Sequence, residues 1–161
     1  MYDFFNQLYK DKPSGHYINM WTLEGKQSKW FLDPEEMLEE TESLTNSNVF
    51  FCMGTGLYKK NIDQRYTIPE ITGISCLHID IDFGEKGHKA KTYAPTIKEA
   101  IDISELILLP SCLVMSGHGL HAYYFLDNYY DKSKQKEKFH EISNLLREFQ
   151  VLTSKLTKYD I

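Results

Sequence analysis

The sequence predicts an α+β fold in which a mixed or antiparallel β-sheet packs against helices. Short apolar runs bounded by glycine and polar residues indicate strands, whereas two capping signals followed by apolar residues at helical spacing indicate helices. Between residues 74 and 126 the order is strand, helix, strand, tight turn, strand. This order predicts a βαββ core with an RRM-like sheet, preceded by an N-terminal extension of helix and strand.

The N-terminal part is predicted to hold a short helix, a hairpin, a capped helix and a buried strand. Glu24-Gly25 separates the two hairpin strands, and Asp33-Pro34-Glu35-Glu36 combines a helix cap, a first-turn proline and a glutamate three residues after the cap. Glycines then end the buried strand. In chain order these elements are residues 2–9, 16–23, 28–32, 34–44 and 48–53.

The C-terminal part is predicted to supply the core of the sheet and a long helix. Thr96-Ile97-Lys98-Glu99 forms a second capping box, and apolar residues recur at helical spacing after Asp131. The predicted elements are a strand at 74–83, a helix at 96–108, strands at 111–115 and 120–126, and a helix at 131–156.

Size and composition favour one folded domain over residues 1–161, with residues 1–45 as an extension and 48–161 as a catalytic core. The chain has 42% hydrophobic residues but no run long enough to span a membrane, so we expect a cytoplasmic protein without a membrane partner. Cys52, Cys76 and Cys112 are widely spaced in apolar surroundings, which predicts buried reduced thiols.

The net charge of -5 argues against a protein that coats duplex DNA, because such binding needs many lysines and arginines against phosphates. Any contact with nucleic acid is therefore expected to be local. Lysines cluster in the loop from Gly84 to Lys91, where they are candidates for phosphate contacts or for an ordinary solvated loop.

The predicted strand at 74–83 carries acidic residues inside an apolar run. Residues two apart on a strand point to one face, so His78, Asp80 and Asp82 share a side opposite an apolar face. Two carboxylates about 6.6 to 7 Å apart repel each other unless a cation lies between them. Their hard oxygens suit Mg2+ or Mn2+, so the pattern indicates a metal site, with a solvated edge strand as the alternative.

A glycine turn, Ser116-Gly117-His118-Gly119, joins two apolar strands, and His121 follows it. Glycines allow close backbone approach, and such a turn can direct amide groups at an anion. Ser116 can donate a hydroxyl group to a phosphate, and His121 can donate an imidazole N–H. The turn therefore indicates a nucleotide phosphate site, with an ordinary tight hairpin as the alternative.

Asp80-Ile81-Asp82 followed by Ser116-Gly117-His118-Gly119-Leu120-His121 resembles the archaeo-eukaryotic primase superfamily, in particular the primase-polymerases of phages and plasmids. The resemblance covers about residues 49–160. It implies a nucleotidyltransferase of DNA replication that moves a nucleotide from a triphosphate to a 3'-hydroxyl by two-metal chemistry. Nucleoside triphosphates and a single-stranded or primed DNA template are the implied partners, with a helicase domain or replication protein as a further one.

The resemblance also implies a role for each matching residue. Asp80 and Asp82 match the metal-binding acids, and His121 joins them as a catalytic residue. The nucleotide-binding positions are Ser116, Gly117, His118, Gly119 and His121. Asp160 looks like the third metal ligand, and the chain ends soon after it, where a further strand would begin, which predicts a truncated catalytic domain.

Two other functions stay open on the sequence. A rolling-circle replication or relaxase nuclease uses paired histidines with a tyrosine nucleophile, for which His118, His121 and Tyr123 or Tyr124 are candidates, although two residues separate these histidines. A non-catalytic domain is the other alternative. It would bind nucleotide or single-stranded nucleic acid through aromatic residues. Its stacking candidates are Tyr123, Tyr124, Tyr129 and Tyr130.

Overall fold

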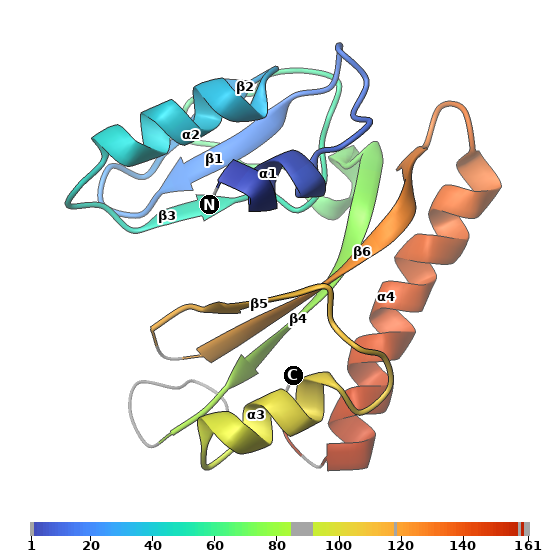
Figure 1. The fold of residues 1–161 in the computed structure, drawn as a ribbon. Helices are drawn as coiled ribbons and strands as arrows, with labels where there is room; N and C mark the ends of the chain where they lie inside the picture. The colour runs from blue at the N-terminus through green and yellow to red at the C-terminus, as the bar shows by residue number, and fades with distance from the viewer. Residues whose placement is uncertain (1, 85–91, 118, 158, 160–161) are drawn as a thin grey trace. The chain divides into compact units, whose positions relative to one another are not determined.

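The computed structural model describes residues 2–84, 92–117, 119–157 and 159. Over these residues the protein is α+β, with two small antiparallel three-stranded sheets and four α-helices (Figure 1). The chain divides into two compact units. Unit 1 contains residues 1–75 and 127–139, and unit 2 contains residues 76–126 and 140–161, so β4, β6 and α4 each pass from one unit into the other.

Unit 1 is built on the sheet with strand order β2-β1-β3, in which both pairings are antiparallel. The β1–β2 pair confirms the predicted hairpin, and Asp33 caps α2 by accepting a hydrogen bond from the backbone N–H of Glu35 at 2.8 Å. The elements are α1 (Tyr2–Leu8), β1 (Ile18–Thr22), β2 (Gln27–Phe31), α2 (Pro34–Ser43), β3 (Val49–Phe51) and a 3-10 turn, Ile68–Glu70.

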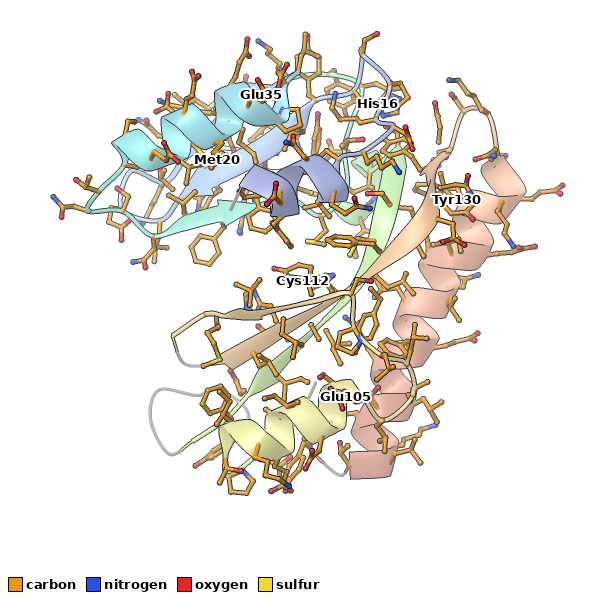
Figure 2. All side chains as sticks on the ribbon, viewed as in Figure 1. His16, Met20, Glu35, Glu105, Cys112 and Tyr130 are labelled. Carbon is orange, nitrogen blue, oxygen red and sulfur yellow. The ribbon has the colours of Figure 1, made fainter. Side chains whose placement is uncertain are left out.

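Helices α1 and α2 cover one face of this sheet. Met20 of β1 is buried beneath α2, where Thr41 donates to its sulfur at 3.3 Å, and Figure 2 shows Met20 at this position. Phe5 of α1 packs edge-on against Phe51 of β3 at 4.9 Å between ring centroids. Alternate residues such as Phe50 point to the other face, and β3 is therefore half-buried where a buried strand was predicted.

A buried polar network joins distant segments of unit 1. The Nδ1 atom of His16 lies 3.0 Å from the hydroxyl of Thr55 and 2.9 Å from that of Tyr129, and its Nε2 atom lies 3.6 Å from Asp131. Burial lowers the pKa of His16, against the attraction of Asp131. Burial also acts to raise the pKa of Asp131, but hydrogen bonds from Ser133 and the nearby cations outweigh it and leave that pKa lowered.

Unit 2 contains most of the sheet with strand order β4-β6-β5, in which β5 and β6 form an antiparallel hairpin. The sequence order strand, helix, strand, turn, strand is confirmed, and in the sheet β6 lies between β4 and β5. The elements are β4 (Gly73–Asp82), α3 (Ile97–Ser104), β5 (Cys112–Met115), β6 (Gly119–Asp131) and α4 (Lys136–Thr157).

One face of the unit 2 sheet packs against α3 and α4. Tyr124 of β6 donates a hydrogen bond to the carbonyl of Ser104 at 2.5 Å and packs edge-on against Phe149 of α4 at 4.9 Å. Ile79 and Ile81 of β4 are buried at 0% and 1% exposure. The other face therefore carries the alternate residues of β4 and β6.

Several predicted helix features differ from the structure. Helix α3 ends at Ser104 rather than near 108, and α4 begins at Lys136 rather than near 131. Leu145 and Leu152 belong to the apolar residues that recur at helical spacing in α4, yet they are 48% and 45% exposed, while Thr153 is buried. The packed face of α4 is therefore narrower than the predicted stripe.

The described cysteines are free thiols, as predicted, although only Cys76 is fully buried. Within the ranges described above, no helix is both long and apolar enough to cross a membrane.

We expect the free energy of unfolding to fall as the pH is lowered through about 6.5, the ordinary pKa of histidine. Burial lowers the native pKa of His16, so the unfolded state binds more protons between the two pKa values and stability rises with pH across that window. For this one group the slope is at most about 1.4 kcal/mol per pH unit. Urea unfolding at several pH values between 5 and 8 measures this slope.

His16→Asn should make this pH dependence shallower. Burial also lowers the pKa of His78, so part of the pH dependence of stability should persist in His16→Asn. An unaltered slope in His16→Asn would show that the network does not carry the effect.

Candidate functional site

The predicted carboxylate face is present on β4. His78, Asp80 and Asp82 alternate with buried Ile79 and Ile81, and the Asp80 side chain is 61% exposed. Asp82 is partly exposed, and its carbonyl accepts a hydrogen bond from the backbone N–H of Ala94 at 3.1 Å. The end of β4 is therefore held by the segment that leads into α3.

The glycine turn closes the β5–β6 hairpin through Ser116. The backbone N–H of Ser116 donates to the carbonyl of Gly119 at 2.9 Å, and its hydroxyl donates to the same carbonyl at 3.1 Å. The hydroxyl also accepts from the N–H of Gly119 at 3.2 Å. Ser116 thus holds the turn together, and a phosphate contact would have to replace one of these bonds. Gly117 has φ +98°, a conformation that favours glycine.

Gly119 lies where β4, β6 and the turn approach most closely. A Cβ atom at this position would lie 3.1 Å from the carbonyl oxygen of Ile81, 3.3 Å from Oδ1 of Asp80 and 3.3 Å from Oγ of Ser116. The missing side chain therefore allows the carboxylate of Asp80 and the hydroxyl of Ser116 to lie on either side of one glycine.

His121 of β6 binds the carboxylate strand directly. Its Nε2 atom lies 3.3 Å from Oδ1 of Asp80, and its Nδ1 atom lies 3.3 Å from the hydroxyl of Tyr123. Burial raises the pKa of Tyr123, so its phenol keeps its proton. The carboxylate of Asp80 can only accept, so Nε2 carries the proton of the neutral ring and Nδ1 accepts from the phenol of Tyr123. This assigns the imidazole N–H to Nε2, directed at Asp80, and orients the ring.

His78 lies on the same face, although no role was predicted for it. Its ring stacks on Tyr123 at 6.4 Å between centroids, and its buried Nδ1 atom has no hydrogen-bond partner among the described residues. Burial lowers the pKa of His78, and the neighbouring His121 lowers it further, so its imidazole is neutral at pH 7. The two histidines and Tyr123 form an aromatic floor beside Asp80.

The structure thus brings together four of the predicted site residues, namely Asp80, Ser116, Gly119 and His121. Asp82 follows on the same strand face. His118 and Asp160 lie outside the described residues, as do Lys86, Lys89 and Lys91 of the lysine loop. Tyr159, beside Asp160 in sequence, donates a hydrogen bond to Glu99 of α3 at 2.7 Å.

The donor set of β4 has the chemistry that a hard divalent cation requires. Two carboxylates share one face of a strand whose other face is packed, and hard oxygen ligands suit Mg2+ and Mn2+. In the described part of the chain, no three His, Cys, Asp or Glu side chains are grouped closely enough to hold a metal ion. Asp80 and Asp82 would therefore need oxygen ligands from another source, such as a substrate phosphate.

Three of the four tyrosines named as candidates for base stacking are packed or bonded within the protein. Tyr123 and Tyr124 are buried at 3% and 2% exposure, and Tyr129 is bonded within the His16 network. A base cannot stack on these rings as they are packed.

Comparison with models of protein families, with curated proteins and with solved structures found no match. Function is therefore inferred from the residues and contacts of the site itself.

We expect Gly119→Ala to destabilise the protein by about 1 to 3 kcal/mol, because the new methyl group would meet the Ile81 carbonyl and the Asp80 carboxylate. Gly117→Ala should cost a similar energy through its backbone conformation, since no atom lies within 4 Å of its Cβ position. Urea unfolding measures both effects.

Gly15→Ala is the matched control, because its Cβ position is open and its φ is not in the left-handed region. It should leave stability unchanged or slightly raised. Equal stability of all three variants would mean that the close approach around Gly119 is not maintained in solution.

Proposed function

We propose that unit 2 carries a nucleotidyltransferase site of the primase-polymerase type on an RRM-like sheet, acting in DNA replication. The reaction would join a nucleotide from a nucleoside triphosphate to a 3'-hydroxyl on a single-stranded or primed DNA template. The observation that supports this most is the contact between two predicted motifs, since the Nε2 atom of His121 lies 3.3 Å from Oδ1 of Asp80.

The packing of β4 supports a role for Asp80 and Asp82 as metal ligands. Buried Ile79 and Ile81 fix the strand, so the two carboxylates are held on one side without a loop that must first become ordered. When bound there, Mg2+ or Mn2+ would lower the pKa of the attacking hydroxyl and neutralise charge on the phosphates.

The second motif is suited to position the triphosphate. His121 is oriented by Tyr123 and Asp80, and its partly exposed side chain, at 34%, is open to a ligand. An imidazole held in one orientation can donate a hydrogen bond to a phosphate oxygen if that oxygen replaces Asp80 as acceptor. The exchange would leave the carboxylate of Asp80 to the cation.

We expect Asp82→Asn to reduce primer extension by at least about a hundred-fold, because the neutral amide is a poor ligand for a divalent cation. The assay uses a labelled primer-template, nucleoside triphosphates and either Mg2+ or Mn2+. Synthesis without a primer is followed in parallel on a single-stranded template.

Asp102→Asn is the control for the loss of one carboxylate. Asp102 is 61% exposed on α3, in the same unit, and pairs only with exposed Lys98 among the described residues. It should retain full activity. Full activity in Asp82→Asn, or a covalent protein-DNA product without extension, would refute the proposal, and the latter would favour a nicking nuclease.

Metal binding can be measured apart from turnover. We expect Asp80→Asn to weaken Mn2+ binding by at least about ten-fold in isothermal titration calorimetry, since it removes one of two anionic ligands. His121→Gln should bind Mn2+ as the wild type does or more tightly, because the imidazole N–H no longer competes for Asp80. Weaker Mn2+ binding in His121→Gln than in Asp80→Asn would instead identify His121, rather than Asp80, as the metal ligand.

A further inference from the structure

Unit 1 contains a pocket of about 420 Å³ on the sheet face opposite α1 and α2. Met20 and Phe51 face the helices, so their neighbours Trp21 and Phe50 point to the other side, where the pocket lies. The volume falls within the range of about 300 to 1,000 Å³ that is typical of small-molecule sites. The residues that line it include Asn19, Trp21, Phe50, Arg65, Tyr66 and Thr67.

Two aromatic rings form the floor of this pocket. Trp21 and Phe50 are direct partners in the β1–β3 pairing, so their side chains stand next to each other on one face. Phe50 is 50% exposed, which leaves a large apolar surface in water. A ring system of this kind favours a flat aromatic ligand that can stack on it.

Arg65 places a positive charge over the ring of Trp21, next to the exposed ring of Phe50. Its guanidinium group lies 5.1 Å from the ring centroid of Trp21. Among the described residues no carboxylate forms an ion pair with Arg65, and the lining of the pocket contains no acidic residue. An aromatic floor with an unneutralised cation at its side matches a nucleobase joined to a phosphate.

The wall that carries Arg65 is held in place by close packing. The ring of Tyr66 packs edge-on against Trp30, with 4.7 Å between ring centroids. It also covers Gly56, where an added Cβ atom would lie 2.3 Å from the Tyr66 ring. The N–H of Ser28 also donates to the carbonyl of Ile62 at 2.5 Å. The pocket is therefore formed before any ligand binds.

The polar groups of the lining are already used within the protein. The amide of Asn19 donates to the hydroxyl of Ser28 at 3.0 Å and to the carbonyl of Lys29 at 3.3 Å. The hydroxyl of Thr67 donates to Glu70 at 2.7 Å. Few groups remain to read the edge of a base, so stacking without base preference is expected.

We infer that this pocket binds a nucleobase of a single-stranded nucleic acid, which stacks on the exposed ring of Phe50 while Arg65, held over Trp21, contacts the adjoining phosphate. The inference rests only on unit 1 and does not depend on phosphoryl transfer at Asp80 and Asp82. A free mononucleotide offers the same base and phosphate chemistry. A strand can gain affinity from the nucleotides that flank the bound base, whereas a free mononucleotide cannot.

The test measures fluorescence anisotropy of labelled single-stranded oligonucleotides with the whole chain in EDTA, so that no divalent metal contributes. Phe50→Ala should weaken binding by about five- to a hundred-fold, the effect of losing one stacked base. Phe50→Tyr keeps the ring and should retain affinity. Arg65→Gln should weaken binding and reduce the dependence of log affinity on log salt by about 0.7, the value for one phosphate contact.

Two control variants lie on the same small sheet or at its end. Lys29→Gln removes a cation from the opposite face, where Lys29 pairs with Glu40, and Leu23→Ala removes an apolar side chain that is 49% exposed. Both should bind as the wild type does. Unchanged affinity in Phe50→Ala and Arg65→Gln would overturn the inference, as would mononucleotides that compete as well as oligonucleotides.

The two proposals fail separately. If the wild type binds strands but does not extend primers, only the proposal for the transfer site is refuted. If Phe50→Ala and Arg65→Gln extend primers and bind strands with unaltered affinity, only the proposal for the pocket is refuted.

Discussion

The alternation of side chains along β4 is the constraint on which the candidate site depends. Ile79 and Ile81 are buried among the residues that face α3 and α4, which fixes the register of the strand. Asp80 and Asp82 must then face the opposite way. A slip of one residue would bury both carboxylates, at a cost of several kcal/mol for each unpaired charge. The packing of the apolar face thus determines where the charged face lies.

Much of the unit 2 architecture could be predicted because its signals are local. Alternating apolar residues, the Thr96 cap and the glycine turn each act over a few residues, and they fixed the order of β4, α3, β5 and β6. The helix ends were harder to place. The carbonyl of Ser104, at the end of α3, accepts from Tyr124 of β6, and the segment before α4 is held through Asp131, whose side chain is bound to Ser133 and approached by distant His16.

The contacts that orient the site depend on pairing between strands, which no single segment encodes. The sequence indicated Asp80 and His121 separately, but the 3.3 Å contact between them and the stacking of His78 on Tyr123 follow from the pairing of β4 with β6. The unit 1 pocket was missed for the same reason. Trp21, Phe50 and Arg65 come from three segments, and only the β1–β3 pairing and the Tyr66 packing bring them to one face.

The His16 network also bears on how the chain acquires its structure during synthesis. Unit 1 begins with the first residues of the chain but is completed by residues 127–139, which supply Tyr129 and Asp131. A chain leaving the ribosome therefore holds His16 and Thr55 in water until most of unit 2 has been made. Only then can these polar groups be withdrawn from solvent together, so unit 1 finishes folding late although it starts first.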